Sequence, residues 1–261
     1  MNIVVCIKQV PETSKVRIHP ETHTLIREGV QSIVNPFDLY ALEEGVRLKE
    51  AYGGTVRVIT MGPPQADTAL REAISVGADE AFLVTDRAFA GADSWVTAYT
   101  LSAAIREMGP TDLILCGKQA IDGDTAQVGP ALAEHLGIPF VAFVRKIREV
   151  SSEELTVERM FEDGVEVVRM PLPGLLTVVK DINEPRLPSL KGKMRARKAE
   201  ITSLDREKLK VEDRFLGLDG SPTRVIHIFS PDLKRSGVKW KEDPEEMAGK
   251  LVRGLKEQGI I

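Results

Sequence analysis

The chain has 261 residues, of which 43% are hydrophobic and 28% are charged, and its formal net charge is −4. A chain of this length can bury one large core, alone or with an appendage, and its small negative charge argues against a general attraction to nucleic acid or anionic membranes. The absence of a long apolar run predicts no membrane span, and the first residues, which resemble neither a basic leader nor a cleavage site, lead us to expect a cytoplasmic protein.

Apolar runs and helical patterns alternate through the first half of the chain. Buried strands are predicted at residues 3–7, 56–61, 81–84 and 112–116. Asn35 and Pro36 predict a helix start, with Asn35 as N-cap and an end at Gly53. Further helices are expected at 63–76 and from a cap at Asp93 to residue 108. Strands joined in this way form right-handed crossovers, so the pattern predicts an α/β fold with a mainly parallel open sheet.

Antiparallel pairs are expected at two places. Residues 15–18 and 24–27 are candidates for a surface hairpin across His19-Pro20-Glu21. Residues 141–150, 154–159 and 165–170 have the pattern of three antiparallel strands, and Asp163-Gly164 is a strong turn signal between the last two. One more buried strand is predicted at 175–179.

The periodic core pattern ends after Asp181. Residues 186–198 are strongly basic and are predicted to be a solvated loop, since they lack the interleaved aromatic residues of a nucleic-acid platform. The functional alternative is a docking surface for an acidic protein, with Leu187, Leu190 and Met194 as apolar anchors. An arm to about residue 237 then leads to an amphipathic helix at 243–258, which needs a surface to pack against.

The stretch from residue 115 to 129 is the most informative part of the sequence. It reads Leu-Cys-Gly-Lys-Gln-Ala-Ile-Asp-Gly-Asp-Thr-Ala-Gln-Val-Gly, an apolar strand followed by a glycine-containing turn and a helix. The first N–H groups of such a helix have no partner and can hold an anion. The turns at 6–10, 35–38 and 60–63 are expected to meet this turn at the carboxyl edge of the sheet. The sequence therefore predicts a nucleotide phosphate site.

The two acids in this turn leave alternatives open. Asp122 and Asp124 would repel a phosphate, so they are expected either to cap the following helix or to accept hydrogen bonds from ribose hydroxyls. Thr125 and Gln127 are better phosphate partners. Cys6 and Cys116 are expected to be buried thiols, and no residue spacing suggests a metal site.

Two common nucleotide motifs are absent from the sequence. The first strand is followed by Lys8-Gln9-Val10-Pro11-Glu12 and not by Gly-x-Gly-x-x-Gly, and Gly117-Lys118 lacks the remainder of a phosphate-binding Walker loop. A standard dehydrogenase, a kinase or another nucleotide-hydrolysing or adenylating enzyme is therefore disfavoured.

Three motifs carry a family resemblance: Asn35-Pro36-Phe37-Asp38, the turn at 117–129, and Asn183-Glu184-Pro185-Arg186. Together they resemble the beta subunit of electron-transfer flavoprotein over nearly the whole chain. The resemblance implies a Rossmann-like nucleotide-binding domain at 1–184. It also implies a docking loop, an arm and a terminal helix at 185–261, which would pack on an alpha subunit that holds FAD.

The resemblance also implies site residues, position by position. The nucleotide contacts of the family fall on Cys6, Asn35, Phe37, Asp38, Met61, Gly117, Gln119, Asp122, Gly123, Asp124, Thr125, Ala126, Gln127 and Val128. Its partner-docking loop falls on 185–198, with Leu190 at the apolar anchor and Lys191, Met194 and Arg195 beside it.

The amino-acid sequence of this turn resembles that of the electron-bifurcating branch of the family. Gly123, Ala126 and Val128 stand where most housekeeping members carry an acid and polar residues. In the bifurcating branch the beta subunit binds a second FAD, which takes a hydride from NADH. One electron then goes towards ferredoxin or flavodoxin and the other, through the alpha-subunit FAD, to an acyl-CoA dehydrogenase-type partner. The alternative is a housekeeping electron carrier with AMP at this site.

Overall fold

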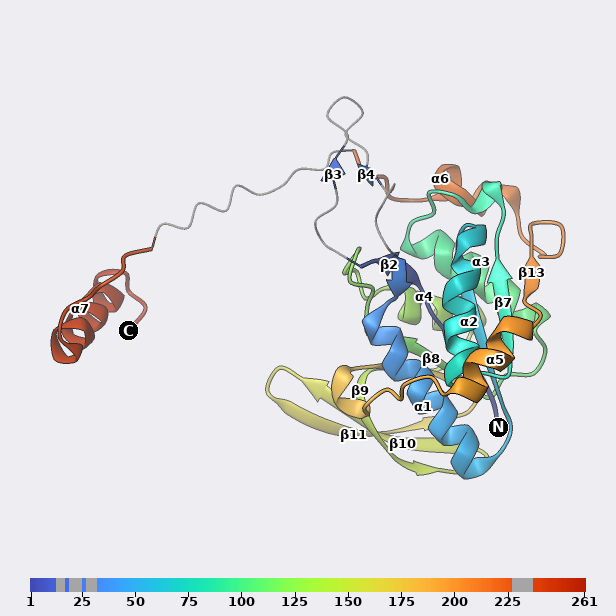
Figure 1. The fold of residues 1–261 in the computed structure, drawn as a ribbon, viewed down its shortest axis with the longest axis horizontal. Coiled ribbons are helices and arrows are strands. Elements are labelled where there is room, and N and C mark those ends of the chain that lie inside the picture. Colours follow the sequence, from blue (N-terminus) through green and yellow to red (C-terminus); the bar gives the residue numbers. More distant parts are fainter. Residues whose placement is uncertain (13–16, 19–24, 27–31, 227–236) are drawn as a thin grey trace. The chain divides into compact units, whose positions relative to one another are not determined.

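The core of the protein is a nine-stranded sheet (Figure 1). The structure, a computed structural model, describes residues 1–12, 17–18, 25–26, 32–226 and 237–261. The strands lie in the order β11-β10-β9-β12-β8-β1-β6-β7-β13. Their bounds are β1 Asn2–Cys6, β6 Thr55–Met61, β7 Glu80–Val84, β8 Leu113–Gly117, β9 Phe140–Val150, β10 Glu154–Phe161, β11 Gly164–Pro171, β12 Gly174–Val178 and β13 Thr202–Leu204. The four strands predicted in the first half of the chain are confirmed as β1, β6, β7 and β8.

Both faces of the sheet are apolar, and helices cover each of them. Along β1, Ile3 and Val5 belong to one core cluster, whereas Val4 and Cys6 belong to another. Helices α1 (Pro36–Tyr52) and α2 (Asp67–Val76) supply the first cluster, and α3 (Ser94–Glu107) and α4 (Val128–Leu136) supply the second. The crossovers are therefore divided between two faces, as in a doubly wound α/β domain.

Several short elements lie between the main helices and strands. Helix α2 is preceded by the 3-10 turn η1 (Pro64–Ala66), and further 3-10 turns are η2 (Arg87–Phe89), η3 (Lys180–Ile182) and η4 (Asp213–Phe215). Strands β2 (Gln9–Pro11) and β5 (Ser32–Val34) pair antiparallel, as do β3 (Arg17–Ile18) and β4 (Leu25–Ile26). The pair β3–β4 lies inside the expected surface hairpin, whose other residues, including His19 and Pro20, fall outside the described residues.

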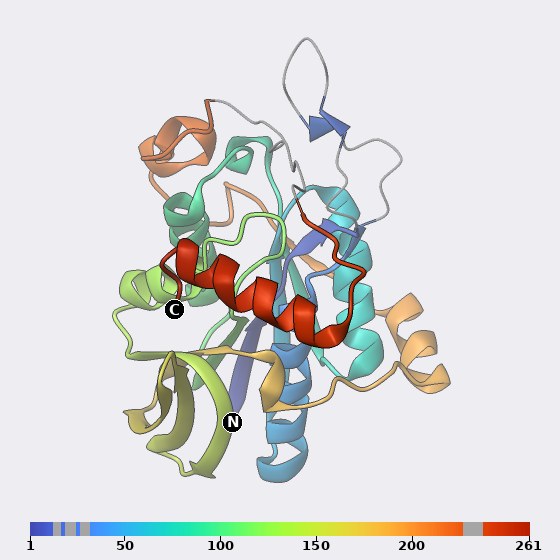
Figure 2. The same cartoon turned by 90° about the vertical axis from the view of Figure 1, so that its left-hand side faces the viewer.

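The antiparallel part of the sheet is formed by β9, β10 and β11, as the sequence predicts. The pairs β9–β10 and β10–β11 are antiparallel, while β12 runs parallel to both β8 and β9. Figure 2 shows these strands as a curled extension of the sheet. Phe161 pairs with Gly164 across the turn at Asp163.

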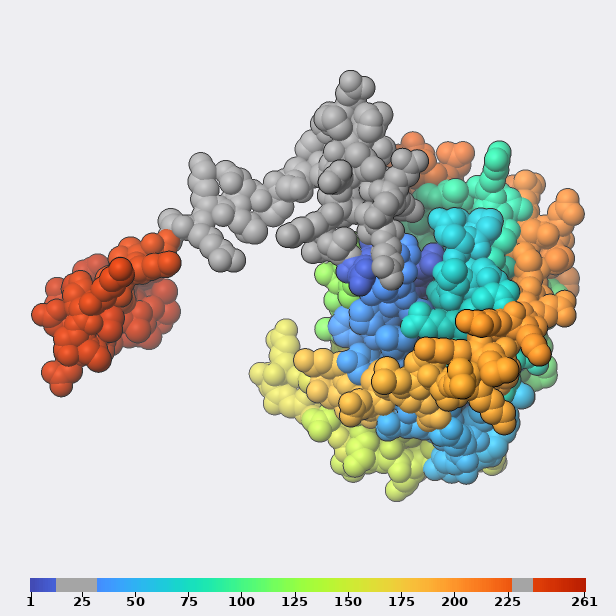
Figure 3. Space-filling view, in the orientation of Figure 1, coloured from blue at the N-terminus to red at the C-terminus, as the bar shows by residue number. Residues whose placement is uncertain are grey.

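The basic segment after residue 185 is a helix and not the expected solvated loop. Helix α5 (Leu190–Lys198) begins at an N-cap, Ser189, whose side chain accepts a hydrogen bond from the Gly192 N–H. It lies over α2 (Figure 3). The Arg195 guanidinium donates to the carbonyls of Ile74 and Ala78 at 2.6 and 2.7 Å. These contacts join residues about 120 positions apart, so local sequence could not predict them.

The chain after α5 also packs on the sheet, although its core pattern is weak. Strand β13 pairs parallel with β7, and Leu204, Leu209 and Leu216 are buried in the second core cluster. The chain accordingly divides into compact units at 1–226 and 227–261, whereas the sequence predicts a boundary at 184/185. The reason is that residues 190–216, together with the short helix α6 (Gly217–Gly220), contribute buried contacts to the first unit.

The second unit contains the terminal helix α7 (Pro244–Glu257), within the range predicted for it. Asp243 caps it by accepting a hydrogen bond from the Glu245 N–H at 3.1 Å. Leu251 and Val252 on this helix are about half exposed, 49% and 46%. Among the helices of the described residues, none has both the length and the apolar character that a membrane crossing needs.

Candidate functional site

The strand order places a topological switch point at the carboxyl ends of β1 and β8, and the region between the turns that follow these two strands is here called the crevice. From β1 the chain proceeds to β6 and β7 on one side, then returns to β8 on the other side of β1. The helices that follow β1 and β8, α1 and α4, cover opposite faces of the sheet. The turns after β1 and β8 therefore diverge, which is where open α/β sheets bind ligands.

Asn35 joins the two turns that border this crevice. Its backbone N–H donates to the Lys8 carbonyl at 2.8 Å, while its side-chain amide donates to the Gln119 carbonyl at 2.8 Å and accepts from the Ile121 N–H at 3.1 Å. The residue is 1% exposed. The predicted helix start is confirmed, with Asn35 at the N-cap position of α1, but the Asn35 side chain makes no capping hydrogen bond to a backbone N–H of the helix and holds the turn after β8 instead.

Asp38 lies below the same crevice. It is 6% exposed, and one carboxylate oxygen accepts the Lys8 backbone N–H at 2.7 Å. Burial raises the pKa of Asp38 from 3.8 to about 7, against smaller lowering effects of the Asn35 side chain and the N–H groups of Lys8 and Gly117. The carboxylate therefore supports the turns from inside the protein.

The turn between β8 and α4 presents a row of free N–H groups. Asp124 and Ala126 both have φ of 53°, in the left-handed region that side chains rarely adopt, whereas Thr125 between them does not. Such alternation directs successive N–H groups to one side and forms an anion-binding concavity. Among the described residues, the N–H groups of residues 125–129 have no acceptor. The positive end of the α4 dipole lies at the same place.

The two acids of the turn are held by side-chain partners. The Lys8 ammonium contacts both oxygens of Asp122, at 2.7 and 2.8 Å, and the Gln119 amide donates to Asp124 at 2.6 Å. Neither acid caps α4, whose N-cap position is Gln127 and has no side-chain cap. The capping alternative is thus wrong for both residues, and the ribose alternative stays a prediction.

The other predicted nucleotide residues surround this turn at different depths. Cys6 and Cys116 are buried neighbours on β1 and β8. The Cys6 thiol and burial hold the pKa of the Cys116 thiol well above its usual range, which makes Cys116 a poor nucleophile. Phe37 and Met61 are partly buried, Gly123 and Thr125 are exposed, and Val128 begins α4. Gln127 accepts a hydrogen bond from the Ser94 hydroxyl at 2.9 Å, which ties the turn to α3.

Two glycines of the turn differ sharply in the space beside them. A Cβ atom added at Gly117 would lie 2.3 Å from Asp38 Oδ1 and 2.6 Å from the Phe37 carbonyl carbon. A Cβ atom added at Gly123 would meet no atom of the described residues within 4 Å. Gly117 is therefore required for close packing of β8 against α1, whereas Gly123 borders open space.

Sequence reasoning missed two side chains of this site. The sequence places Lys8 only in the turn after the first strand, and Ser94 only directly after a helix cap. Their contacts with Asp122 and Gln127 span 114 and 33 residues. The single local signal for Lys8 is its place directly after a buried strand.

The predicted docking residues lie on α5 and do not all face outward. Leu190 and Met194 are 78% and 56% exposed, and Lys191 is exposed as well. Arg195, which the sequence predicts beside them, is exposed as well, but its guanidinium donates to the Ile74 and Ala78 carbonyls at the end of α2. The outward face of α5 therefore consists of the two apolar side chains and the remaining cations.

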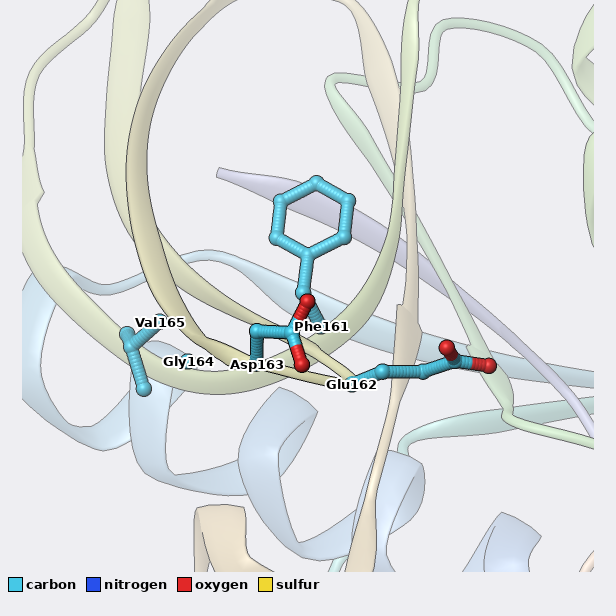
Figure 4. A pocket seen from close by; sticks show the side chains of 5 residues that line it. All are labelled: Phe161, Glu162, Asp163, Gly164 and Val165. Carbon is cyan, nitrogen blue, oxygen red and sulfur yellow. The ribbon is translucent and has the colours of Figure 1, made fainter.

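Two of the hollows formed by the described residues lie away from the crevice. One is lined by five consecutive residues of the β10–β11 turn, Phe161 to Val165, where Glu162 and Val165 point in opposite directions (Figure 4). The other lies near the amino ends of β8 and β12, beside Thr111 and Gly174. Neither brings together convergent polar groups of the kind that the turn at 118–129 provides.

Comparisons with known proteins point to one family. A family model described as "Electron transfer flavoprotein domain" matches residues 22–209. The chain is 52% identical to "Electron transfer flavoprotein subunit beta" of Thermoanaerobacterium thermosaccharolyticum, over 100% of both chains. It is 48% identical to "Caffeyl-CoA reductase-Etf complex subunit CarD" of Acetobacterium woodii, over 100% of both, and 46% identical to "Protein FixA" of Azotobacter vinelandii, over 95% of this chain and 92% of the relative.

Proposed function

The chain belongs to the beta-subunit family of electron transfer flavoproteins, and from that premise we propose that its crevice binds FAD in an electron-bifurcating complex. The observation that carries the proposal is the row of N–H groups at residues 125–129, beside the α4 N-terminus, which have no acceptor among the described residues. A diphosphate carries the negative charge that this arrangement favours.

The residues around the turn are compatible with a dinucleotide. Gly123 borders open space, and Ala126 has a small apolar side chain, so neither places bulk or charge beside the phosphates. The buried groups of Asn35 and Asp38 hold the two turns from below and leave the N–H groups free for a ligand. Backbone donors fixed in this way bind an anion with little reorganisation.

FAD at this site would supply the redox chemistry, accepting a hydride from NADH and passing one electron towards ferredoxin or flavodoxin and one towards the alpha-subunit FAD. The part of this chain is to hold the diphosphate with backbone N–H groups and to keep the two crevice turns in register. We propose that an acyl-CoA dehydrogenase-type flavoenzyme receives electrons from the alpha-subunit FAD. The relative named as a subunit of a caffeyl-CoA reductase–Etf complex supports a partner of this class.

Flavin stoichiometry tests the proposal directly. The complex of this chain with its alpha subunit is expected to contain two flavins per heterodimer, and NADH is expected to bleach flavin absorbance. One flavin together with AMP would contradict FAD binding here and favour the structural-nucleotide alternative, because AMP would use the same N–H groups.

The substitution Gly123→Asp should lower the flavin content from two towards one per heterodimer. The new carboxylate would stand beside a phosphate and repel it, while the open space around Gly123 allows the chain to fold normally. The matched control is Gly123→Ala, which adds a methyl group without charge and should keep two flavins. The measurement is flavin absorbance per mole of purified complex, and normal occupancy in Gly123→Asp would refute this placement of the diphosphate.

We propose that the exposed apolar side chains of α5 dock the electron-transfer partner. Leu190→Ala should raise the KM for the acyl-CoA dehydrogenase-type partner about tenfold, because truncating an apolar anchor typically costs more than about 1 kcal/mol of binding. Flavin content should stay normal. The control is Phe161→Ala, which truncates an exposed apolar residue at the end of β10. Strand β10 lies beside the edge strand β11, whereas α5 packs on α2. Equal KM values for the wild type and Leu190→Ala would contradict the assignment.

A further inference from the structure

The anion-binding turn contains an electrostatic conflict. Asp122 and Asp124 stand directly before the free N–H groups of residues 125–129. Two carboxylates beside a phosphate oppose its binding, since like charges at short range repel. A turn that binds a diphosphate therefore needs a means of reducing this negative charge.

The structure treats the two acids differently. Asp124 accepts one hydrogen bond from the Gln119 amide, which fixes its carboxylate but leaves its charge in place. Asp122 is paired through both oxygens with the Lys8 ammonium, at 2.7 and 2.8 Å. Only the second contact cancels a full negative charge.

The pair joins the two sides of the crevice. Lys8 follows β1, and its backbone is fixed at both ends, because its N–H donates to Asp38 and its carbonyl accepts from the Asn35 N–H. Asn35 in turn holds residues 119 and 121, just before Asp122. The two buried residues therefore place the ammonium opposite the carboxylate.

The pair is poorly suited to stabilising the fold. The Lys8 and Asp122 side chains are 48% and 34% exposed, and ion pairs at such exposure contribute little to stability. The Lys8–Asp122 pair is therefore more important for ligand binding at the turn beside it than for the stability of the fold.

We propose that Lys8 is a positioning residue that neutralises Asp122 and so allows the turn to accept a nucleotide phosphate. The inference rests on the proposed nucleotide site and adds to it the residue that sets the charge of the cradle. If Lys8 acts only by neutralising Asp122, Lys8 should be dispensable once Asp122 is replaced. A Lys8 that contacts the phosphate itself would be needed in either case.

The test is a double-mutant cycle on the purified complex with the alpha subunit, after removal of the nucleotide from this chain. Binding of FAD and, separately, of AMP is titrated for the wild type, Lys8→Met, Asp122→Asn and the double variant. Lys8→Met should weaken binding about tenfold, because it leaves one uncompensated charge near the phosphate. The double variant should return to within about threefold of the wild type.

The controls separate shielding from a general charge effect and from misfolding. Lys49→Met breaks a lysine–aspartate pair of similar length, 2.9 Å to Asp79, near the C-terminal end of α1 and away from the crevice, and should change affinity less than about threefold. Thermal unfolding midpoints should be similar for all variants, and the loss in Lys8→Met should shrink at high salt.

The outcomes distinguish this inference from the proposed function. A wild-type complex that binds neither nucleotide overturns both. A wild type that binds while Lys8→Met binds equally well overturns the shielding role alone. A double variant as weak as Lys8→Met also overturns it, since Lys8 would then contact the phosphate itself.

Discussion

Replacing Gly117 by alanine should lower the free energy of unfolding by about 3 kcal/mol or more and should abolish nucleotide binding. The added Cβ atom would lie 2.3 Å from Asp38 Oδ1, 2.6 Å from the Phe37 carbonyl carbon and 2.8 Å from the Asp38 nitrogen. Two of these atoms are backbone at the start of α1, so the clash cannot be relieved by rotating a side chain. Either β8 or α1 must move, and the crevice lies between them.

The control for this prediction is Gly123→Ala, six residues later in the same turn. Its Cβ atom would meet nothing within 4 Å in the part of the chain that the structure describes, and its φ is not in the left-handed region. Its free energy of unfolding should therefore equal that of the wild type or exceed it slightly, by less than about 1 kcal/mol. Urea unfolding of the full chain measures both variants. A Gly117→Ala variant as stable as Gly123→Ala would show that the two elements are not in close contact.

The contrast between these glycines shows what the sequence could reveal about the site. The turn at 117–129 is recognisable because a buried strand, small residues and a helix pattern follow one another along the chain. Nothing in that pattern distinguishes Gly117 from Gly123. The difference arises because α1, about 80 residues earlier, packs against one and not the other.

Asn35 likewise has a local role that the sequence predicts and a long-range role that it does not predict. Asn followed by Pro correctly places the start of α1, because both residues favour the first turn of a helix for local reasons. The role of the Asn35 side chain depends on where β8 ends, since the amide bonds to residues 119 and 121. Contacts between turns that meet only at a switch point have no signal in local spacing.

The C-terminal part of the first unit was hardest to predict for a related reason. Helix α5 has few apolar residues, and its attachment comes from the guanidinium groups of Arg71 and Arg195, which donate to backbone carbonyls of α5 or α2. Strand β13 is three residues long and is formed by pairing with β7. By contrast, the longer strands and helices of the first half contain enough buried residues to show a regular strand or helix pattern in the sequence. Their predicted bounds therefore agree closely with the structure.

The stability of the protein should depend on pH through Asp38. The pKa of Asp38 in the folded state, about 7, lies above its ordinary value of 3.8 in the unfolded chain, so the folded state binds more protons than the unfolded state between these values. Stability should therefore fall as pH rises through this window. From pH 5 to pH 8 the contribution of this one carboxyl is a loss of about 3 kcal/mol.

Asp38→Asn should remove this component, because an amide of similar shape stays neutral at every pH. The free energy of unfolding of the variant relative to the wild type should therefore rise by about 3 kcal/mol between pH 5 and pH 8, whatever its value at pH 5. Urea unfolding of both chains at several pH values measures this difference. Glu43, whose pKa is lowered chiefly by the Arg186 side chain against the effect of burial, is present in both chains and cancels. Parallel pH profiles would mean that Asp38 ionises freely in the folded protein, and that the turns after β1 and β8 are not held around a buried carboxyl.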